Sequence, residues 1–238
     1  MIVMAMYKNI ELLGDSILQG VQINPVNKHY YTKNEIDTQM LCKKFDCSIK
    51  NNSRFGCTVI KGKKLLNNML SSGFHCDALV MDFGGNDCDY KWKDIAENPN
   101  GVFEPNTPLP LFIEEYRSMI RDLKEHEIVP ILTTLPPLEP QLFFDWWCRT
   151  LNKENVIKWL KTITQIYVHQ ENYSKQIEIL AREEQVKLID IRKEFLNYGA
   201  ISDLICEDGT HPNSEGQKLI TKAFDEFFSK EQNRFVIG

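Results

Sequence analysis

Two short segments, one near each end of the chain, contain the side chains that can activate a serine hydroxyl. The segment GDS ends at Ser16, and the segment DGTH begins at Asp208 and ends at His211. A hydroxyl becomes a strong nucleophile only when a base removes its proton and a carboxylate orients that base. Asp208 and His211 can lie side by side in a loop, which leaves the second imidazole nitrogen to face Ser16. Taken alone, each segment also fits the start of a helix, where polar residues cap the backbone.

Two further loops offer donors for the oxyanion that forms during acyl transfer. The segment GGND includes Asn86 and follows the apolar run DALVMDF, and the segment NNSRFGCT includes Gly56. The Asn86 amide and the unshielded Gly56 N–H are donors of the kind that stabilise a tetrahedral oxyanion. The N–H of Ser16, at the expected start of a helix, is a third. Loops rich in Gly and Asn also form plain turns, which is the alternative for both segments.

Strand and helix patterns alternate along the chain and predict the scaffold that positions these residues. Strands separated by helices form a mostly parallel sheet covered on both faces, and ligands bind beyond the carboxyl ends of its strands. Ser16 and Asn86 follow predicted strands directly. The predicted strands are residues 9–13, 77–83, 128–135 and 186–191. The predicted helices include residues 61–72, 111–126 and 213–228.

The length of 238 residues fits a single α/β domain that spans the whole chain, 1–238. Two stretches are expected as insertions, at about 89–110 and 141–170. The first is rich in Pro and is predicted to be an irregular loop. The second has no Gly or Pro and is predicted to be helical. Its aromatic residues either wall an acyl or sugar pocket or hold the inserted helices on the domain: Phe143, Phe144, Trp146, Trp147 and Trp159.

Composition and charge limit the classes of partner. The net charge of −5 argues against nucleic acid, and no uncharged stretch reaches the 18 residues of a membrane span. The N-terminal sequence MIVMAMYKNI lacks a charged leader and a cleavage site, which predicts no signal peptide. Seven scattered cysteines without C-x-x-C pairs indicate reduced thiols, a cytoplasmic location and no zinc site. No cofactor is expected, and no feature indicates an oligomeric state.

Other polar residues near these motifs are expected to have structural roles. Asp15 and Asp87 flank the motifs and are predicted to brace their loops through hydrogen bonds rather than to act as acids. Four histidines lack a nearby carboxylate or metal-ligand spacing and are expected at the surface or in packing. These are His29, His75, His126 and His169.

The four motifs together resemble the SGNH, or GDSL-like, hydrolase family. They occur along the chain in the family's order. In the second motif only Gly56 is matched to a family residue, because Ser53 stands where the family often has Gly. The resemblance implies a three-layer α/β/α sandwich around a mostly parallel, five-stranded, flavodoxin-like sheet. It also implies Ser16 as nucleophile, His211 as base and Asp208 as its partner, with no metal. The implied oxyanion donors are Ser16, Gly56 and Asn86.

The activity implied by the resemblance is hydrolysis of a carboxylic ester through an acyl-enzyme. A small-molecule ester with a short acyl group, or an O-acetyl ester on a carbohydrate, is the expected substrate, by analogy with the family. Two alternatives remain open at this point. The same site fits an acyltransferase that passes the acyl group to an alcohol, and the fold fits a binding module without turnover.

Overall fold

The centre of the computed structural model, which describes residues 7–33 and 35–237, is a five-stranded parallel sheet. The strand order is β4-β1-β5-β6-β7, and every neighbouring pair is parallel. This arrangement confirms the predicted α/β/α sandwich with a five-stranded sheet. The strands are β1 (Asn9–Gly14), β4 (Ser48–Asn51), β5 (Ala78–Asp82), β6 (Val129–Thr133) and β7 (Lys187–Ile189).

The central strands are buried on both faces, which explains their continuous apolar sequences. In β1, Leu12 joins the apolar cluster on one face of the sheet and Leu13 joins the cluster on the other. In β5, Val80 and Met81 divide between the same two clusters. Because successive side chains of a strand point to opposite faces, the sheet needs a layer of helices on each side.

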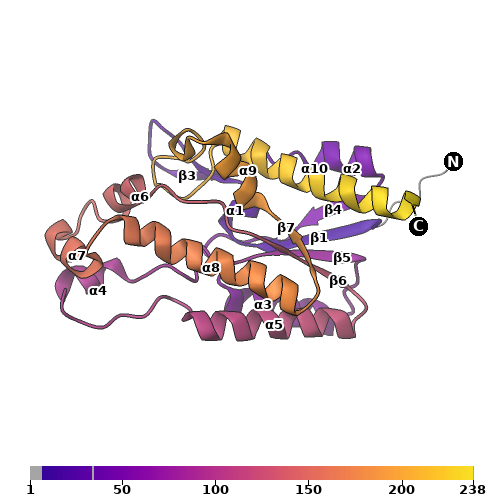
Figure 1. Ribbon diagram of the computed structural model, residues 1–238, viewed down its shortest axis with the longest axis horizontal. Helices are drawn as coiled ribbons and strands as arrows, with labels where there is room; N and C mark the ends of the chain where they lie inside the picture. Colours follow the sequence, from indigo (N-terminus) through magenta and orange to yellow (C-terminus); the bar gives the residue numbers. More distant parts are fainter. Residues whose placement is uncertain (1–6, 34, 238) are drawn as a thin grey trace.

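Helices cover both faces of the sheet (Figure 1). One layer packs against the face that contains Leu13, and it consists of α3 (Val59–Ser71), α5 (Leu109–Glu125) and α8 (Thr164–Glu183). The other layer consists of α1 (Ser16–Gln19), α2 (Thr38–Phe45), α9 (Ile191–Tyr198) and α10 (Ser214–Ile237), with the short 3₁₀ turn η1 (Ile201–Asp203) after α9. The closing helix α10 is longer than the predicted 213–228.

A small antiparallel hairpin stands outside the main sheet and was not predicted from the sequence. It pairs β2 (Val21–Ile23) with β3 (Tyr30–Thr32). Its strands have only three residues each, and those of β3 are half-buried or exposed. So short a strand without a clear apolar alternation carries too little signal to be recognised from sequence.

Three helices form a separate group at one end of the molecule (Figure 1). They are α4 (Trp92–Glu97), α6 (Pro140–Trp147) and α7 (Lys153–Leu160). We call this group the cap. Together with the start of α8 it has its own apolar cluster, which includes Ile95, Phe144 and Val156. The prediction that 89–110 is wholly irregular was wrong, because α4 forms there and packs Ile95 into the cap.

The described residues also bear on the predictions about membranes and thiols. No helix within residues 7–33 and 35–237 has the length and apolar character needed to cross a bilayer. All seven cysteines lie within the described residues, and each is a free thiol in the structure. The prediction that there is no signal peptide rests partly on residues 1–6, which lie outside the described residues.

Candidate active site

Ser16 lies at the carboxyl edge of the sheet, where β1 passes into α1. Asp15 caps this short helix, and its Oδ1 accepts a hydrogen bond from the Ile17 N–H at 2.8 Å. The preceding Gly14 is required by a close approach, because a Cβ there would lie 2.8 Å from the carbonyl oxygen of Asp82 in the neighbouring strand. The turn thus brings Ser16 to the start of the helix, with its side chain largely buried.

The structure brings Ser16 and His211 together, although 195 positions separate them in the sequence. His211 Nε2 lies 2.9 Å from Ser16 Oγ. The other ring nitrogen, Nδ1, is hydrogen-bonded to Asp208 Oδ2. Ser16, His211 and Asp208 therefore form a continuous hydrogen-bonded chain with the geometry of a nucleophile, a base and an orienting carboxylate.

Asp208 is fully buried, and four donors surround its carboxylate. Oδ1 accepts from the backbone N–H groups of Thr210 and His211, both at 3.1 Å. Oδ2 accepts from His211 and from the Tyr30 hydroxyl, the latter at 3.2 Å. Burial alone would raise the pKa of Asp208, but the hydrogen bonds and the charge of His211 outweigh it and lower the pKa below its ordinary value. The charged form of Asp208 is thus favoured.

The loop that carries Asp208 and His211 folds back on itself. Ile205 and Pro212 form an isolated antiparallel bridge, and the Cys206 N–H donates to the His211 carbonyl at 2.7 Å. At the tip, Gly209 has a φ of +74° and lies against the first turn of α6. A Cβ at Gly209 would lie 2.1 Å from the backbone nitrogen of Phe143. The cap therefore packs directly on the loop.

Asn86 reaches the site from the loop after β5 and is held by Asp15. Its Nδ2 donates to Asp15 Oδ2 at 2.9 Å, which leaves the second amide hydrogen free to serve another acceptor. Burial, followed by the charge of nearby Asp82, raises the pKa of Asp15 well above its ordinary value. Asp87 accepts from the Val59 N–H at the start of α3. The prediction that Asp15 and Asp87 brace their loops is confirmed.

The loop that contains Gly56 borders the site through its neighbour Phe55. The Phe55 ring stacks on His211 with an interplanar angle of 12° and ring centroids 6.1 Å apart. Gly56 has a φ of +66°, a conformation that favours glycine. Ser53 does not adopt this left-handed conformation, so a serine is accommodated there.

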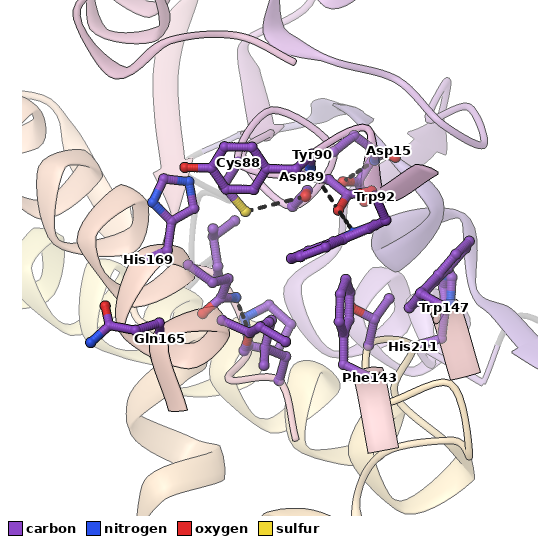
Figure 2. A pocket seen from close by; sticks show the side chains of 18 of the residues that line it. Asp15, Cys88, Asp89, Tyr90, Trp92, Phe143, Trp147, Gln165, His169 and His211 are labelled. Carbon is purple, nitrogen blue, oxygen red and sulfur yellow. Dashed lines mark hydrogen bonds between the residues drawn. The ribbon is translucent and has the colours of Figure 1, made fainter. Parts of the chain in front are cut away.

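A cavity of about 430 Å³ opens from Ser16 and His211 toward the cap. Aromatic, aliphatic and polar side chains share its wall, and Figure 2 shows Phe143 and Trp147 on one side of the view and His169 and Gln165 on the other. Asp89 adds a carboxylate, which accepts from Trp92 Nε1 at 2.8 Å. Burial raises the pKa of Asp89 to about 6.

The aromatic residues of 141–170 divide between the wall of the cavity and the packing of the cap. Phe143, Trp147 and Trp159 line the cavity. Phe144 instead packs into the cap, where it is 3% exposed. A single aromatic-rich stretch thus supplies both the cavity wall and the core that supports it, because its residues lie on different faces of their helices.

Three residues of the site were missed from the sequence. His169 was expected only in surface or packing positions, yet it lines the cavity, and burial lowers its pKa. Tyr30, from a segment without a motif, and Phe55, which precedes Gly56 in the second motif, contact His211 with ring centroids 5.3 and 6.1 Å from the imidazole. No sequence signal indicated these contacts. Among residues 7–33 and 35–237, no group of three or more His, Cys, Asp or Glu side chains is placed to hold a metal ion.

Solved structures share this fold at low sequence identity. A lipase/acylhydrolase from Enterococcus faecalis is 18% identical, with a TM-score of 0.66, and the match covers 95% of this chain and 96% of that one. A GDSL-like lipase from Bacteroides thetaiotaomicron is 16% identical, with a TM-score of 0.61 and coverage of 94% and 89%. An acetylxylan esterase from Geobacillus stearothermophilus is 15% identical, with a TM-score of 0.66 and coverage of 93% and 94%.

The family comparison covers most of the chain. A comparison with curated proteins finds no match. The sequence model of the GDSL-like lipase/acylhydrolase family, in contrast, matches residues 12–219, which include all four motifs. The chain therefore belongs to the GDSL-like lipase/acylhydrolase family and is a hydrolase that acts on esters.

Proposed function

We propose that the protein hydrolyses carboxylic esters through an acyl-enzyme on Ser16. One observation carries this proposal, the 2.9 Å contact between Ser16 Oγ and His211 Nε2, with Asp208 hydrogen-bonded behind the imidazole. Each of these three residues is at least 95% buried, so the protein encloses the contact on most sides. The arrangement supports proton transfer from a hydroxyl to an imidazole as the first chemical event.

In the acylation step, Ser16 Oγ forms a bond to the ester carbonyl carbon while its proton moves to His211 Nε2. The carbonyl π-bond electrons go to the oxygen, which becomes the oxyanion of a tetrahedral intermediate. When this collapses, the bond to the alkoxy oxygen breaks, and His211 returns its proton to the leaving alcohol. Asp208 stabilises the imidazolium throughout, because its carboxylate is charged and directly hydrogen-bonded to the ring.

In the deacylation step, His211 removes a proton from water while the water oxygen attacks the acyl carbon. The second tetrahedral intermediate releases the carboxylic acid, and the proton passes from His211 back to Ser16. We assign the oxyanion donors in both steps to the N–H groups of Ser16 and Gly56 and to Asn86 Nδ2. The hydrogen bond from Asn86 to Asp15 supports this role, since it orients the amide beforehand.

We propose an ester with a short acyl group, and in particular an O-acetyl ester of a carbohydrate, as the substrate. Aromatic walls with a few polar groups suit a sugar ring, whose faces are apolar and whose rim carries hydroxyls. The cavity offers Trp147 and Trp159 as walls and Asp89, Gln165 and His169 as polar groups. That the acetylxylan esterase of Geobacillus stearothermophilus shares the fold is consistent with this choice.

The first test compares the wild type with Ser16→Ala on p-nitrophenyl esters of increasing acyl length and on acetylated sugars. We expect turnover to fall about a thousandfold or more, the scale seen when a triad member is removed. Melting temperatures of the two proteins serve as the folding control. Retained turnover in the folded variant would refute the mechanism.

The alternatives give different results in the same assays. An acyltransferase would form a new ester when an alcohol is added, whereas a hydrolase releases the free acid regardless. A binding module without turnover would leave Ser16 unlabelled by a fluorophosphonate probe. We expect labelling of the wild type and none of Ser16→Ala.

We also propose that the protein works in a reducing compartment, the cytoplasm. Its seven free thiols support this, because disulfides form readily in oxidising compartments. Mass spectrometry of protein denatured and alkylated directly on cell lysis tests it, with seven alkylated thiols expected and disulfide-linked peptides as the contrary outcome.

A further inference from the structure

The hydroxyl of Tyr30 contacts the candidate catalytic machinery from outside the four motifs. It donates a hydrogen bond to Asp208 Oδ2, the same oxygen that binds His211 Nδ1. An ionised carboxylate accepts about four hydrogen bonds, and Tyr30 supplies the fourth, after His211 and two backbone amides. Without it, Oδ2 would keep only the bond to His211.

The Tyr30 ring also contacts the imidazole. It meets His211 edge-on, with ring centroids 5.3 Å apart, and packs against Phe55 at 5.5 Å. Phe55 in turn stacks on His211. Two aromatic rings therefore hold the imidazole, one from the β2–β3 hairpin and one from the Gly56 loop.

Two contacts hold the β2–β3 hairpin, and with it Tyr30, in place relative to Asp208. Lys28, in its turn, makes an ion pair with Glu207 at 2.6 Å, the residue next to Asp208. At the other end, the Lys33 N–H donates to the Gly20 carbonyl at 3.0 Å. The hairpin is thus tied both to the loop that carries Asp208 and to the end of the helix that carries Ser16.

We propose that Tyr30 is a positioning residue that completes the hydrogen-bond shell of Asp208 and so sets the basicity of His211. This inference rests on the proposed function. The Tyr30 hydroxyl disperses the negative charge on Oδ2, which weakens the attraction between Asp208 and a protonated His211. Removal of the hydroxyl should strengthen that attraction and favour the protonated imidazole.

Tyr30 remains a donor over the working pH range. Burial, followed by the charge of Asp208, raises the pKa of its hydroxyl above the ordinary value. Among the described residues, the Asp208 charge also acts on the Cys206 thiol, and the Arg149 charge acts on the Tyr30 hydroxyl. Next along the loop, Glu207 is paired with Lys28 of the hairpin, and Glu139 of the α6 segment meets the loop through its backbone N–H, which donates to the Gly209 carbonyl.

The experiment compares Tyr30→Phe with Tyr31→Phe, the neighbouring tyrosine on the same strand. Tyr31 donates to Gln22 at 3.2 Å, away from the triad, so its variant controls for loss of a hairpin hydroxyl. Hydrolysis of p-nitrophenyl acetate is followed from pH 5 to 9. We expect the acidic limb of kcat/KM for Tyr30→Phe to move up by roughly half a pH unit, with Tyr31→Phe matching the wild type.

A second measurement does not depend on turnover. The downfield proton resonance of the His211 Nδ1–H, recorded by NMR, should shift in Tyr30→Phe and stay in place in Tyr31→Phe. Superimposable pH profiles and an unmoved resonance in folded Tyr30→Phe overturn the inference. Turnover by Ser16→Ala would instead overturn the proposed function, and the resonance would then decide the role of Tyr30 by itself.

Discussion

At the scale of single residues, hydrogen-bond acceptors of the protein orient the donor groups of the site before a substrate binds. Asp15 is the clearest case, because its two oxygens bind the Ile17 N–H in the helix of Ser16 and the amide of Asn86. The buried carboxyl thus links Ser16, the proposed nucleophile, to an expected oxyanion donor. A donor that is already oriented loses no free energy to reorganisation during the reaction.

Replacement of Asn86 tests whether this donor acts on the transition state. In Asn86→Ala we expect kcat to fall about a hundredfold or more, typical of the loss of one oxyanion donor, with little change in KM. Steady-state kinetics on p-nitrophenyl acetate supply both values. A large rise in KM at unchanged kcat would show that Asn86 binds the ground state instead.

At the scale of elements, the site forms where separate segments of the chain pack against the loop that carries Asp208 and His211. The loop from Ile205 to Pro212 is closed by its own bridge, and α6 then packs onto its tip at Gly209. The cap is therefore connected to the Asp208–His211 loop by backbone contact as well as through the cavity. A change at this contact should affect both stability and catalysis.

Alanine at Gly209 tests the contact, and Gly199→Ala is a matched control. Both glycines have positive φ, +74° and +100°, but a Cβ at Gly199 meets nothing within 4 Å. Both variants carry backbone strain, and only Gly209→Ala adds overlap with Phe143. We expect Gly209→Ala to lose roughly 1–3 kcal/mol more than the control, or about 2–4 °C in Tm per kcal/mol, and to lose activity. Equal losses in the two variants would contradict a contact with α6.

At the scale of the whole molecule, buried carboxyl groups beneath the active site couple stability to pH. Asp82 is 1% exposed, accepts a hydrogen bond from Thr133 at 2.6 Å, and has its pKa raised to about 6 by burial. Burial likewise raises the pKa of Asp87 to about 6. A raised folded-state pKa means that the folded protein binds these protons more tightly than the unfolded chain does.

The sign of the pH effect follows directly. Between about pH 4, where Asp titrates in unfolded chains, and pH 6, the folded state holds more protons, so the free energy of unfolding should fall as pH rises. Each such carboxyl contributes a few kcal/mol to this fall. Urea titrations at pH 4.5, 6 and 8 measure it. Asp82→Asn should show a smaller fall than the wild type, and parallel curves would show that Asp82 does not titrate in this range.

The sequence by itself determined the scaffold and the chemical candidates. Continuous apolar runs predicted the central strands. A strand with apolar residues at successive positions has two apolar faces, and it is stable only in a sheet covered by a layer on each side. Ser16, Asp208 and His211 were recognisable because their chemistry is tied to local motifs. Their contact in the structure agrees with that prediction, and Ser16→Ala tests their roles.

Only the tertiary structure decided which other residues meet these side chains. Tyr30 lies in a three-residue strand and Phe55 in a loop, and neither position carries a periodic or motif signal. The helix α4 was missed because six residues among prolines give little helical pattern. For Tyr30 and Phe55 the physical reason is the same. Contacts between distant segments depend on packing of whole elements, whereas local sequence patterns report only which face of an element is buried.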